Sequence, residues 1–340
     1  MGQSPDSDSY NDNEDGIPFF QGNADFGEKY PTTRKWCNAP TKIAHAEDIL
    51  ISVRAPIGAL NYAKEGCCIG RGLAAITPNQ DKVSSEFIYW LLKGKHKELN
   101  LQGTGSTFKA ISRKVLEEIK VPDIELKKQT ELAGNLEKIY SVIQLRKQQL
   151  EELDVLIKAR FVEMFGDMIL NPNNWEKTEL GKICDVRDGT HDSPKYYLEG
   201  YPLVTSKNLS SGRIDFTDCN LINEEDYNKI NTRSKVDYGD ILMPMIGTVG
   251  NPIIVDSMAE FAIKNVALIK FFDESKVINT FIKALLESDY FDMAVLSKIR
   301  GGTQKFISLE DIRKLEVCVP PLEVQIEFEQ FVTQVDKLKL

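Results

Sequence analysis

The feature that most constrains how this chain folds is a heptad stretch over residues 129–165. Its apolar residues recur at alternating spacings of three and four, the pattern of a helix with one apolar seam. The seam contains Leu132, Leu136, Ile139, Ile143, Leu150, Leu153, Ile157 and Met164, and Arg146 and Arg160 interrupt it. At 1.5 Å per residue the helix is expected to be roughly 55 Å long. Because one compact domain cannot bury so long a seam, the pattern predicts a second long helix as its partner.

An internal repeat surrounds this stretch. Five landmarks recur in the same order in the two halves, which predicts a tandem duplication. Those of the first half are Asp48-Ile-Leu50, Ile57-Gly58, Thr107-x-Lys109-x-Ile-Ser112, Val121-Pro122 and the seam start Leu132, Leu136 and Ile139. Those of the second are Asp240-Ile-Leu242, Val249-Gly250, Thr303-x-Lys305-x-Ile-Ser308, Val319-Pro320 and Phe328, Val332 and Val335. Between the landmarks the halves diverge, for example in residues 21–25 and 205–209, which indicates two modules doing one job on different targets.

Composition places the chain among ordinary globular proteins. Its 340 residues suggest at least two domains, 42% of them are hydrophobic, and no window holds the ~18 apolar residues of a membrane helix. The acidic, polar start carries no secretory signal. Six cysteines without a C-x-x-C pair favour reduced thiols in a cytoplasmic protein, and three scattered histidines argue against a metal site.

Several short motifs carry a resemblance to a known family. They are Gly2-Gln-Ser-Pro5, Ile17-Pro18 with Gln21-Gly-Asn23, Gly239-Asp-Ile-Leu242 with Ile246-Gly-Thr-Val-Gly250, residues 301–308, and Val319-Pro-Pro-Leu-Glu-Val-Gln325. In this order, and with a heptad helix after each half, they resemble the specificity (S) subunit of type I restriction–modification systems over essentially the whole chain. Against that pattern both ends look shortened: residues 175–186 have no first-half counterpart, and the second helix reaches only Leu340.

The resemblance implies an α+β fold. Two mixed α/β target-recognition domains are joined and spaced by long helices that form an antiparallel coiled coil. We expect the first domain at residues 1–122, the spacer helix at 123–167, the second domain at 168–320 and the start of the second spacer helix at 321–340. Each domain would read one half of a split DNA target. Successive groove faces of B-DNA lie ~34–36 Å apart, so a stiff helix suits the task of setting the separation.

The resemblance also implies partners. An S subunit has no catalytic site; it binds double-stranded DNA, methyltransferase (M) subunits that modify adenine, and ATP-dependent restriction (R) subunits, and no membrane. S-adenosylmethionine, ATP and Mg²⁺ are therefore expected in the partner subunits, and no cofactor in this chain. With a short second helix, the later part of the first seam is expected to be unpaired and to form a subunit interface. The candidates are Arg146, Leu150, Leu153, Ile157 and Arg160.

Two glycine-rich loops are the first candidates for DNA contact. Glycine lets the backbone approach a phosphate, and hydroxyl and lysine side chains donate to its oxygens. An ordinary loop before a helix has a similar composition. The candidate residues are Thr104, Ser106 and Lys109 in the first half, with Arg54 after a strand, and Arg300, Thr303, Gln304 and Lys305 in the second.

Basic, aromatic and amide residues in the divergent segments are the second group of candidates. Arginine reads guanine, and asparagine or glutamine reads adenine, in the major groove. For any single residue, solvated surface charge is the alternative interpretation. The residues are Gln21, Asn23, Lys29, Tyr30 and Arg34 in the first half, and Lys195, Lys207, Asn208 and Arg213 in the second.

The net charge of −9 opposes this interpretation, because phosphate contacts need Lys and Arg. Binding depends on where charge lies, however, and M subunits can supply phosphate contacts. Two other classes stay open: an adenine-DNA methyltransferase or nuclease fragment, and a coiled-coil interaction protein. Residues 171–175 are similar to the Asn-Pro-Pro-aromatic motif of amino-methyltransferases, but they depart from it and no glycine-rich cofactor loop accompanies them, so we interpret them as a linker turn.

Overall fold

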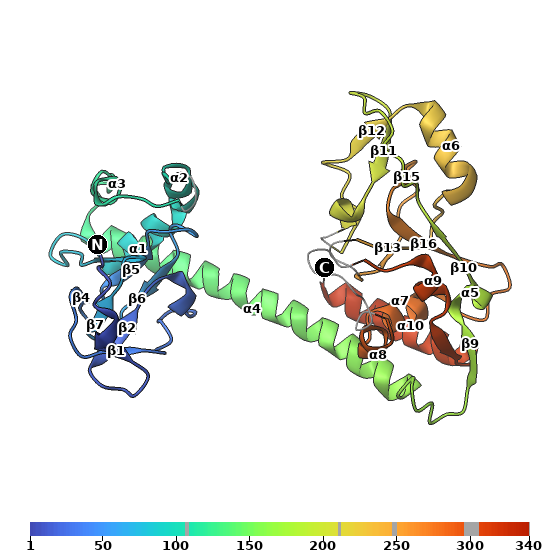
Figure 1. The fold of residues 1–340 in the computed structure, drawn as a ribbon, viewed down its shortest axis with the longest axis horizontal. Coiled ribbons are helices and arrows are strands. Elements are labelled where there is room, and N and C mark those ends of the chain that lie inside the picture. Colours follow the sequence, from blue (N-terminus) through green and yellow to red (C-terminus); the bar gives the residue numbers. More distant parts are fainter. Residues whose placement is uncertain (106–108, 210–211, 247–249, 296–305, 340) are drawn as a thin grey trace. The chain divides into compact units, whose positions relative to one another are not determined.

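The computed structural model describes residues 1–105, 109–209, 212–246, 250–295 and 306–339 (Figure 1). The chain forms two compact units, residues 1–146 and 147–340. The long helix predicted from the heptad pattern is present as α4 (Leu126–Phe165), whose 40 residues begin in the first unit and end in the second. Within the described ranges, no helix is long and apolar enough to cross a membrane. All six cysteines are free thiols.

In the described part of the first unit the strands form two small sheets. Its five-stranded sheet has the order β1 (Tyr10–Asn11), β3 (Trp36–Cys37), β2 (Ile17–Phe20), β7 (Cys67–Ile69) and β4 (Ile43–Ala44). Its three-stranded sheet has the order β6 (Leu60–Tyr62), β5 (Ile49–Ser52) and β8 (Leu73–Ile76). All four residues of β5 are buried, which explains why Ile49, Leu50 and Ile51 are all apolar rather than alternating with polar residues.

Short helices complete the first unit. They are η1 (Ser7–Ser9), η2 (Asn23–Asp25), α1 (Ser85–Gly94), α2 (His96–Leu101) and α3 (Arg113–Glu117). Ser84 caps α1, because its hydroxyl oxygen accepts from the Phe87 N–H. The core joins Ile49 and Ile51 of β5 to Phe87 and Leu92 of α1 and to Ala133 of α4. The first part of α4 is thus packed on this unit.

The described residues of the second unit form three sheets. Their strand orders are β10 (Cys184–Asp188), β16 (Val266–Phe271), β13 (Ile241–Pro244) and β14 (Ile253–Ile254); β12 (Asn220–Ile222), β11 (Tyr201–Val204) and β15 (Ala262–Ile263); and β17 (Glu316–Val319) and β9 (Glu176–Glu179). The helices are α5 (Leu180–Ile183), η3 (Ser206–Leu209), α6 (Glu224–Ser234), α7 (Asn279–Leu286), α8 (Asp289–Ala294), α9 (Leu309–Arg313) and α10 (Leu322–Lys339). Phe161 and Phe165 of α4 pack against Phe281 of α7 and Phe328 of α10.

The predicted duplication is visible in the strand pairing. Strand β2 runs antiparallel to β3 and parallel to β7, and β11 runs antiparallel to β12 and parallel to β15. The sheet β6-β5-β8 likewise corresponds to β14-β13-β16. The residues just before β2 and β11 are also equivalent. Gly16 and Gly200 have positive φ, and a Cβ on either would lie 2.1 Å from the carbonyl oxygen of Cys37 or Ile222.

Helix α10 covers the later part of the α4 seam and runs in the opposite direction. Arg160 pairs with Glu327 at 3.2 Å, and Asp154 pairs with Lys339 at 2.8 Å. Ile157 packs against the core of the second unit, and Leu150 and Leu153 are half-buried. The expectation that this part of the seam is unpaired is therefore wrong, because in antiparallel packing the start of one helix lies beside the end of the other.

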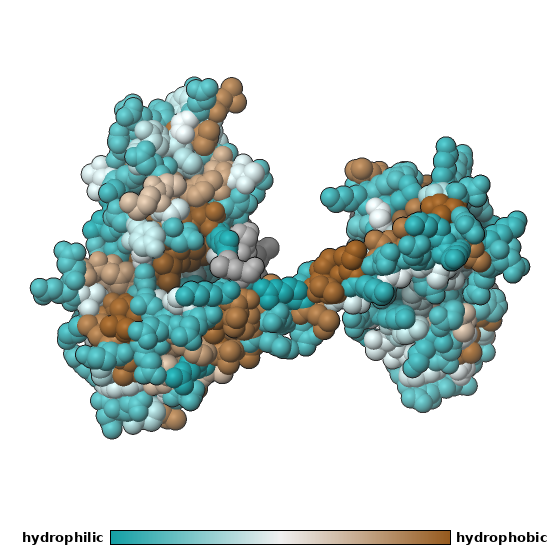
Figure 2. Space-filling model, turned by 180° about the vertical axis from the view of Figure 1, so that it is seen from behind, coloured by the Kyte–Doolittle hydropathy of each residue, from teal (hydrophilic) through white to brown (hydrophobic). Residues whose placement is uncertain are grey.

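The exposed part of the seam lies earlier in α4. Leu136, Ile139 and Ile143 are 42%, 58% and 46% exposed, and the neighbouring Val142 and Leu145 are each 65% exposed. Figure 2 shows apolar residues on the surface of this part of the helix. An uncovered stripe of this kind is uncommon on a soluble protein and is typical of an interaction surface.

Candidate nucleic-acid interface

The structure brings three of the predicted residues, Arg54, Thr104 and Lys109, together beyond the end of β5. Ala110 forms backbone bridges with both Arg54 and Thr104, and the Ala55 N–H donates to the Lys109 carbonyl at 3.0 Å. All three side chains are exposed. Among the described residues, neither cation has a carboxylate partner. This end of the first unit therefore presents uncompensated positive charge.

Gln21 joins this group from the loop after β2. Its carbonyl accepts from the Gly72 N–H at 3.1 Å, and the Gly72 carbonyl accepts from Val53, the residue before Arg54, at 2.9 Å. The Asp25 carboxylate accepts from the Gln21 N–H at 2.7 Å and fixes the loop. The Gln21 side chain is exposed, while Asn23 is half-buried. Only Gln21 therefore presents a freely accessible amide.

Lys29 and Tyr30 lie elsewhere in the first unit. The Lys29 ammonium is 5.6 Å from the centre of the Tyr30 ring and 5.9 Å from that of Tyr62, which is a cation–π arrangement. Tyr62 pairs with Ile49, at the opposite end of β5 from Arg54. Arg34 is exposed. The structure therefore does not group these predicted residues with the Arg54 end.

In the second unit, the predicted base contact by Asn208 is wrong. Asn208 is only 4% exposed. Its Oδ1 accepts from the Thr205 N–H at 3.0 Å and the Thr205 hydroxyl at 2.9 Å, and its Nδ2 donates to the Asp215 carbonyl at 3.1 Å. The amide is used to close the turn after β11, as Asp25 closes the turn after β2.

The remaining predicted residues divide into two groups. Lys195, Lys207 and Arg213 are exposed, and the Lys195 ammonium lies 5.6 Å from the centre of the Tyr197 ring. The candidates Ser106, Arg300, Thr303, Gln304 and Lys305 lie outside the described residues.

Sequence reasoning missed a polar cluster around His191. Its Nε2 lies 2.8 Å from Asp188 Oδ2 and its Nδ1 lies 2.7 Å from Asn265 Oδ1. Arg233 also pairs with Asp188, which is 5% exposed. Hydrogen bonds to Asn265 and Asp188 raise the pKa of His191 above its usual value. Thr190, Asp192, Lys229 and Arg233 line a hollow beside this cluster. The sequence feature that could have drawn attention to this segment is a Ser-Pro pair that occurs in each half, Ser4-Pro5 and Ser193-Pro194.

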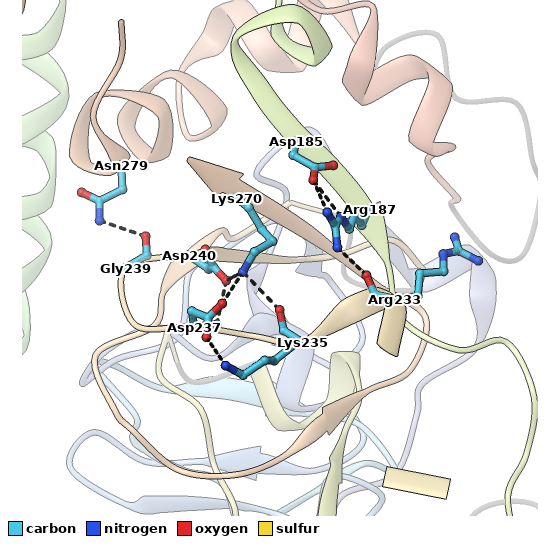
Figure 3. Close-up of polar contacts among 9 residues, drawn as sticks. All are labelled: Asp185, Arg187, Arg233, Lys235, Asp237, Gly239, Asp240, Lys270 and Asn279. Carbon is cyan, nitrogen blue, oxygen red and sulfur yellow. Dashed lines mark hydrogen bonds and ion pairs between the residues drawn. The ribbon is translucent and has the colours of Figure 1, made fainter. Parts of the chain in front are cut away.

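A second network joins strands β10 and β16 to the end of α6 and the segment after it (Figure 3). Lys270 of β16 donates to Asp240 at 2.5 Å, to Asp237 at 2.9 Å and to the Lys235 carbonyl at 3.1 Å. Burial raises the pKa of Asp240, while hydrogen bonds from Lys270 and Lys235 lower that of Asp237. Arg187 of β10 donates to the carbonyl of Arg233 at the end of α6 at 2.7 Å. These contacts fix β10, β13, β16 and α6, and so hold the cluster in place.

Two α/β units of one topology, each followed by a long helix, define a duplicated two-module protein. The family model for the type I restriction modification DNA specificity domain matches residues 1–155 and again residues 172–340. The chain therefore belongs to the type I restriction–modification specificity family, as its motifs indicated.

Individual relatives agree with the family match. The chain is 44% identical over 154 residues to the MjaX specificity subunit of Methanocaldococcus jannaschii, covering 45% of this chain and 36% of that one, about a third of its length. It is 22% identical to the EcoBI specificity subunit of Escherichia coli, covering 85% and 67%. The crystal structure of the type I S subunit from M. genitalium matches with a TM-score of 0.52 and 16% identity over 99% of this chain and 86% of that one, which shows a shared fold.

Proposed function

We propose that this chain is the DNA sequence-specificity subunit of a type I restriction–modification complex. The observation that carries the proposal is the duplication: one strand topology occurs twice, within two matches to a DNA specificity domain. The side chains exposed on the two copies differ, with Arg54, Gln21 and Lys109 on one and His191 and Lys195 on the other. Two copies of a fold with different polar surfaces suit the reading of two unlike half-sites in one split target.

The long helices would set the distance between the half-sites. The domains of this proposal are residues 1–122 and 168–320, and the spacers are residues 123–167 and 321–340. The opposite directions of α4 and α10, with Phe161 and Phe165 against Phe328, support an antiparallel coiled coil. A helix of 40 residues is roughly 60 Å long at 1.5 Å per residue. That length exceeds one turn of B-DNA, which is ~34–36 Å.

The chemistry would belong to partner subunits. In this proposal M subunits methylate adenine with S-adenosylmethionine, R subunits use ATP and Mg²⁺, and this chain carries no catalytic residue. The exposed seam at Leu136, Ile139 and Ile143 is the surface we assign to subunit assembly. This assignment replaces the interface predicted around Leu150 from the sequence.

Methylome sequencing of cells that express this chain with an M subunit tests the proposal. The expected result is adenine methylation at one motif with two short specified parts and a fixed unspecified gap. The double variant Arg54→Ala, Lys109→Ala should lose this methylation, while Lys82→Ala, an exposed lysine beyond the far end of β8, should retain it. Methylation at a continuous motif, or none with any M subunit that binds the chain, would contradict the proposal.

A further inference from the structure

Equivalent connections in the two units each carry a cation. In the first unit residues 70–72 link β7 to β8, and in the second residues 264–265 link β15 to β16. Arg71 and Lys264 lie in these connections. The connections are anchored alike, since the Gly70 N–H donates to the Phe20 carbonyl at 2.8 Å and the Lys264 N–H donates to the Val204 carbonyl at 2.9 Å. Phe20 and Val204 end the equivalent strands β2 and β11.

In each unit an equivalent segment, which contains Gly2 or Gly189, lies against this connection. Gly2 N–H donates to the Leu73 carbonyl at 2.8 Å, and Gly189 N–H donates to the Val266 carbonyl at 3.0 Å. A Cβ on Gly2 would lie 2.2 Å from the Gly70 oxygen, and one on Gly189 would lie 2.1 Å from the Ile263 oxygen. Only glycine permits an approach this close. Each segment then leads to a serine that precedes a proline, Ser4 or Ser193.

Each serine contacts the cation of its own unit. The Arg71 Nε donates to the Ser4 hydroxyl oxygen at 3.3 Å, and the Lys264 Nζ donates to the Ser193 hydroxyl oxygen at 2.6 Å. A hydroxyl that accepts from a cation still has its own hydrogen to donate. Cation and hydroxyl together therefore present converging donors, which is the arrangement that a phosphate oxygen binds.

Neither positive charge is neutralised within its unit. In the part of the chain that the structure describes, no carboxylate pairs with Arg71 or Lys264. By contrast, Lys270 pairs with Asp240, and Lys339 pairs with Asp154. Arg71 also lies near Arg54, because the next residue, Gly72, accepts from Val53. The same end of the first unit thus gathers Arg54, Arg71 and Lys109.

We propose that the pairs Ser4–Arg71 and Ser193–Lys264 are equivalent contact sites for backbone phosphates of DNA, one in each recognition domain. The inference rests on the proposed function and adds to it two sites that position the domains on the duplex. Such contacts fix register and orientation without specifying sequence. Their repetition fits this role, because a contact to the uniform backbone is retained when base-reading side chains diverge.

The salt dependence of DNA binding tests the inference. The full chain, assembled with its M subunits, is titrated with target and unrelated duplexes between 50 and 200 mM salt. Arg71→Gln and Lys264→Gln should each weaken binding to both duplexes alike and lower the slope of log K against log salt by about 1. Matched controls are Lys82→Gln and Lys276→Gln. These exposed lysines lie beyond the opposite ends of β8 and β16, and their carbonyls accept from Gln129 and Gln325 respectively.

The outcomes separate this inference from the proposed function. Wild-type slopes for both Arg71→Gln and Lys264→Gln, with the complex still binding its target, overturn the phosphate sites and leave the proposed function standing. A lower unfolding temperature with an unchanged slope makes the pairs structural contacts only, and also overturns the inference. An assembled wild-type complex that binds no DNA overturns both. Ser4→Ala and Ser193→Ala remove no charge, so they should weaken binding while leaving the slope unchanged.

Discussion

Gln129 and Gln325 occupy the same place in the two halves and make the same three hydrogen bonds. Gln129 is 2% exposed; its side chain accepts from the Ser84 N–H at 3.0 Å and donates to the carbonyls of Ile124 and Lys82 at 2.7 and 3.3 Å. Gln325 is 0% exposed; its side chain accepts from the Ile278 N–H at 3.0 Å and donates to Pro320 and Lys276 at 2.8 and 2.9 Å. Each amide joins the first turn of a long helix to the residue that precedes α1 in the first unit or α7 in the second.

We expect Gln129→Ala and Gln325→Ala to destabilise the unit that carries the change by about 3 kcal/mol, because each leaves several buried backbone groups unpaired. Hydrogen exchange resolved by segment measures the effect in each unit separately, which matters because two units need not unfold as one. Gln148→Ala is the control, since Gln148 is exposed and donates to Glu152 on the same helix at 2.8 Å. It should change the free energy of unfolding by less than about 0.5 kcal/mol. Equal effects of all three substitutions would contradict the assigned role.

The sequence predicts best those features that depend on neighbouring residues along the chain. The α4 helix and the duplication follow from periodicity and order along the chain. The burial of Asn208 could not be predicted in this way, because it depends on a contact with the Asp215 carbonyl that the fold creates. In a divergent loop, nothing in the local sequence distinguishes a buried asparagine from an exposed one.

The seam shows a different limit. Its apolar residues and the antiparallel direction of the second helix were predicted, but the covered part was placed at the wrong end, because the start of α10 packs beside the end of α4 at Phe161 and Phe165. Arg71 and His191 were missed because their partners Ser4 and Asn265 are distant in sequence. The predicted domain limits at residues 122, 167 and 320 stay predictions.

Replacing Lys270 by methionine should destabilise the second unit by about 3–5 kcal/mol, because it leaves the buried Asp240 carboxylate without its cation. Asp240 is 5% exposed and lies 2.5 Å from the Lys270 ammonium. Urea unfolding monitored by hydrogen exchange in β13 and β16 measures the loss. Lys235→Met removes the other lysine of the network, whose side chain is 68% exposed, and should leave the stability close to that of the wild type. Adding Asp240→Asn to Lys270→Met should restore part of the stability; a double variant less stable than Lys270→Met would refute this account.

His191 should make the second unit less stable as pH rises through neutrality. Its pKa is raised in the folded state, chiefly by the hydrogen bond to Asn265 and also by Asp188. The folded protein therefore holds the proton more tightly than the unfolded chain, whose histidine pKa is about 6.5. The resulting stabilisation is complete below that value and is lost as pH rises through the folded-state pKa. The effect is small, because the side chain is 61% exposed.

An NMR titration of the His191 ring measures this pKa directly. Asn265→Ala should lower it, because the substitution removes the principal hydrogen-bond partner of the ring. His191→Gln should flatten the pH dependence of unfolding of the second unit between about pH 6 and 8, since glutamine does not titrate. A His191 pKa that Asn265→Ala leaves unchanged would rule out the hydrogen bond as its cause.

The two parts of the α4 seam should respond differently to a charge. Ile143 is 46% exposed, and Ile143→Asp should leave the stability of the chain within about 0.5 kcal/mol of wild type while weakening its capture of M subunits in a pull-down. Ile157 packs against the core of the second unit, so Ile157→Asp should lower stability by about 2 kcal/mol or more. Val155→Asp is the control. Val155 is 64% exposed. Because successive residues of a helix are rotated by about 100°, it lies on another face of α4 than Ile143 and Ile157. Val155→Asp should therefore change neither the stability nor the capture of M subunits. Full capture of M subunits by Ile143→Asp would contradict the proposal that the exposed part of the seam binds them.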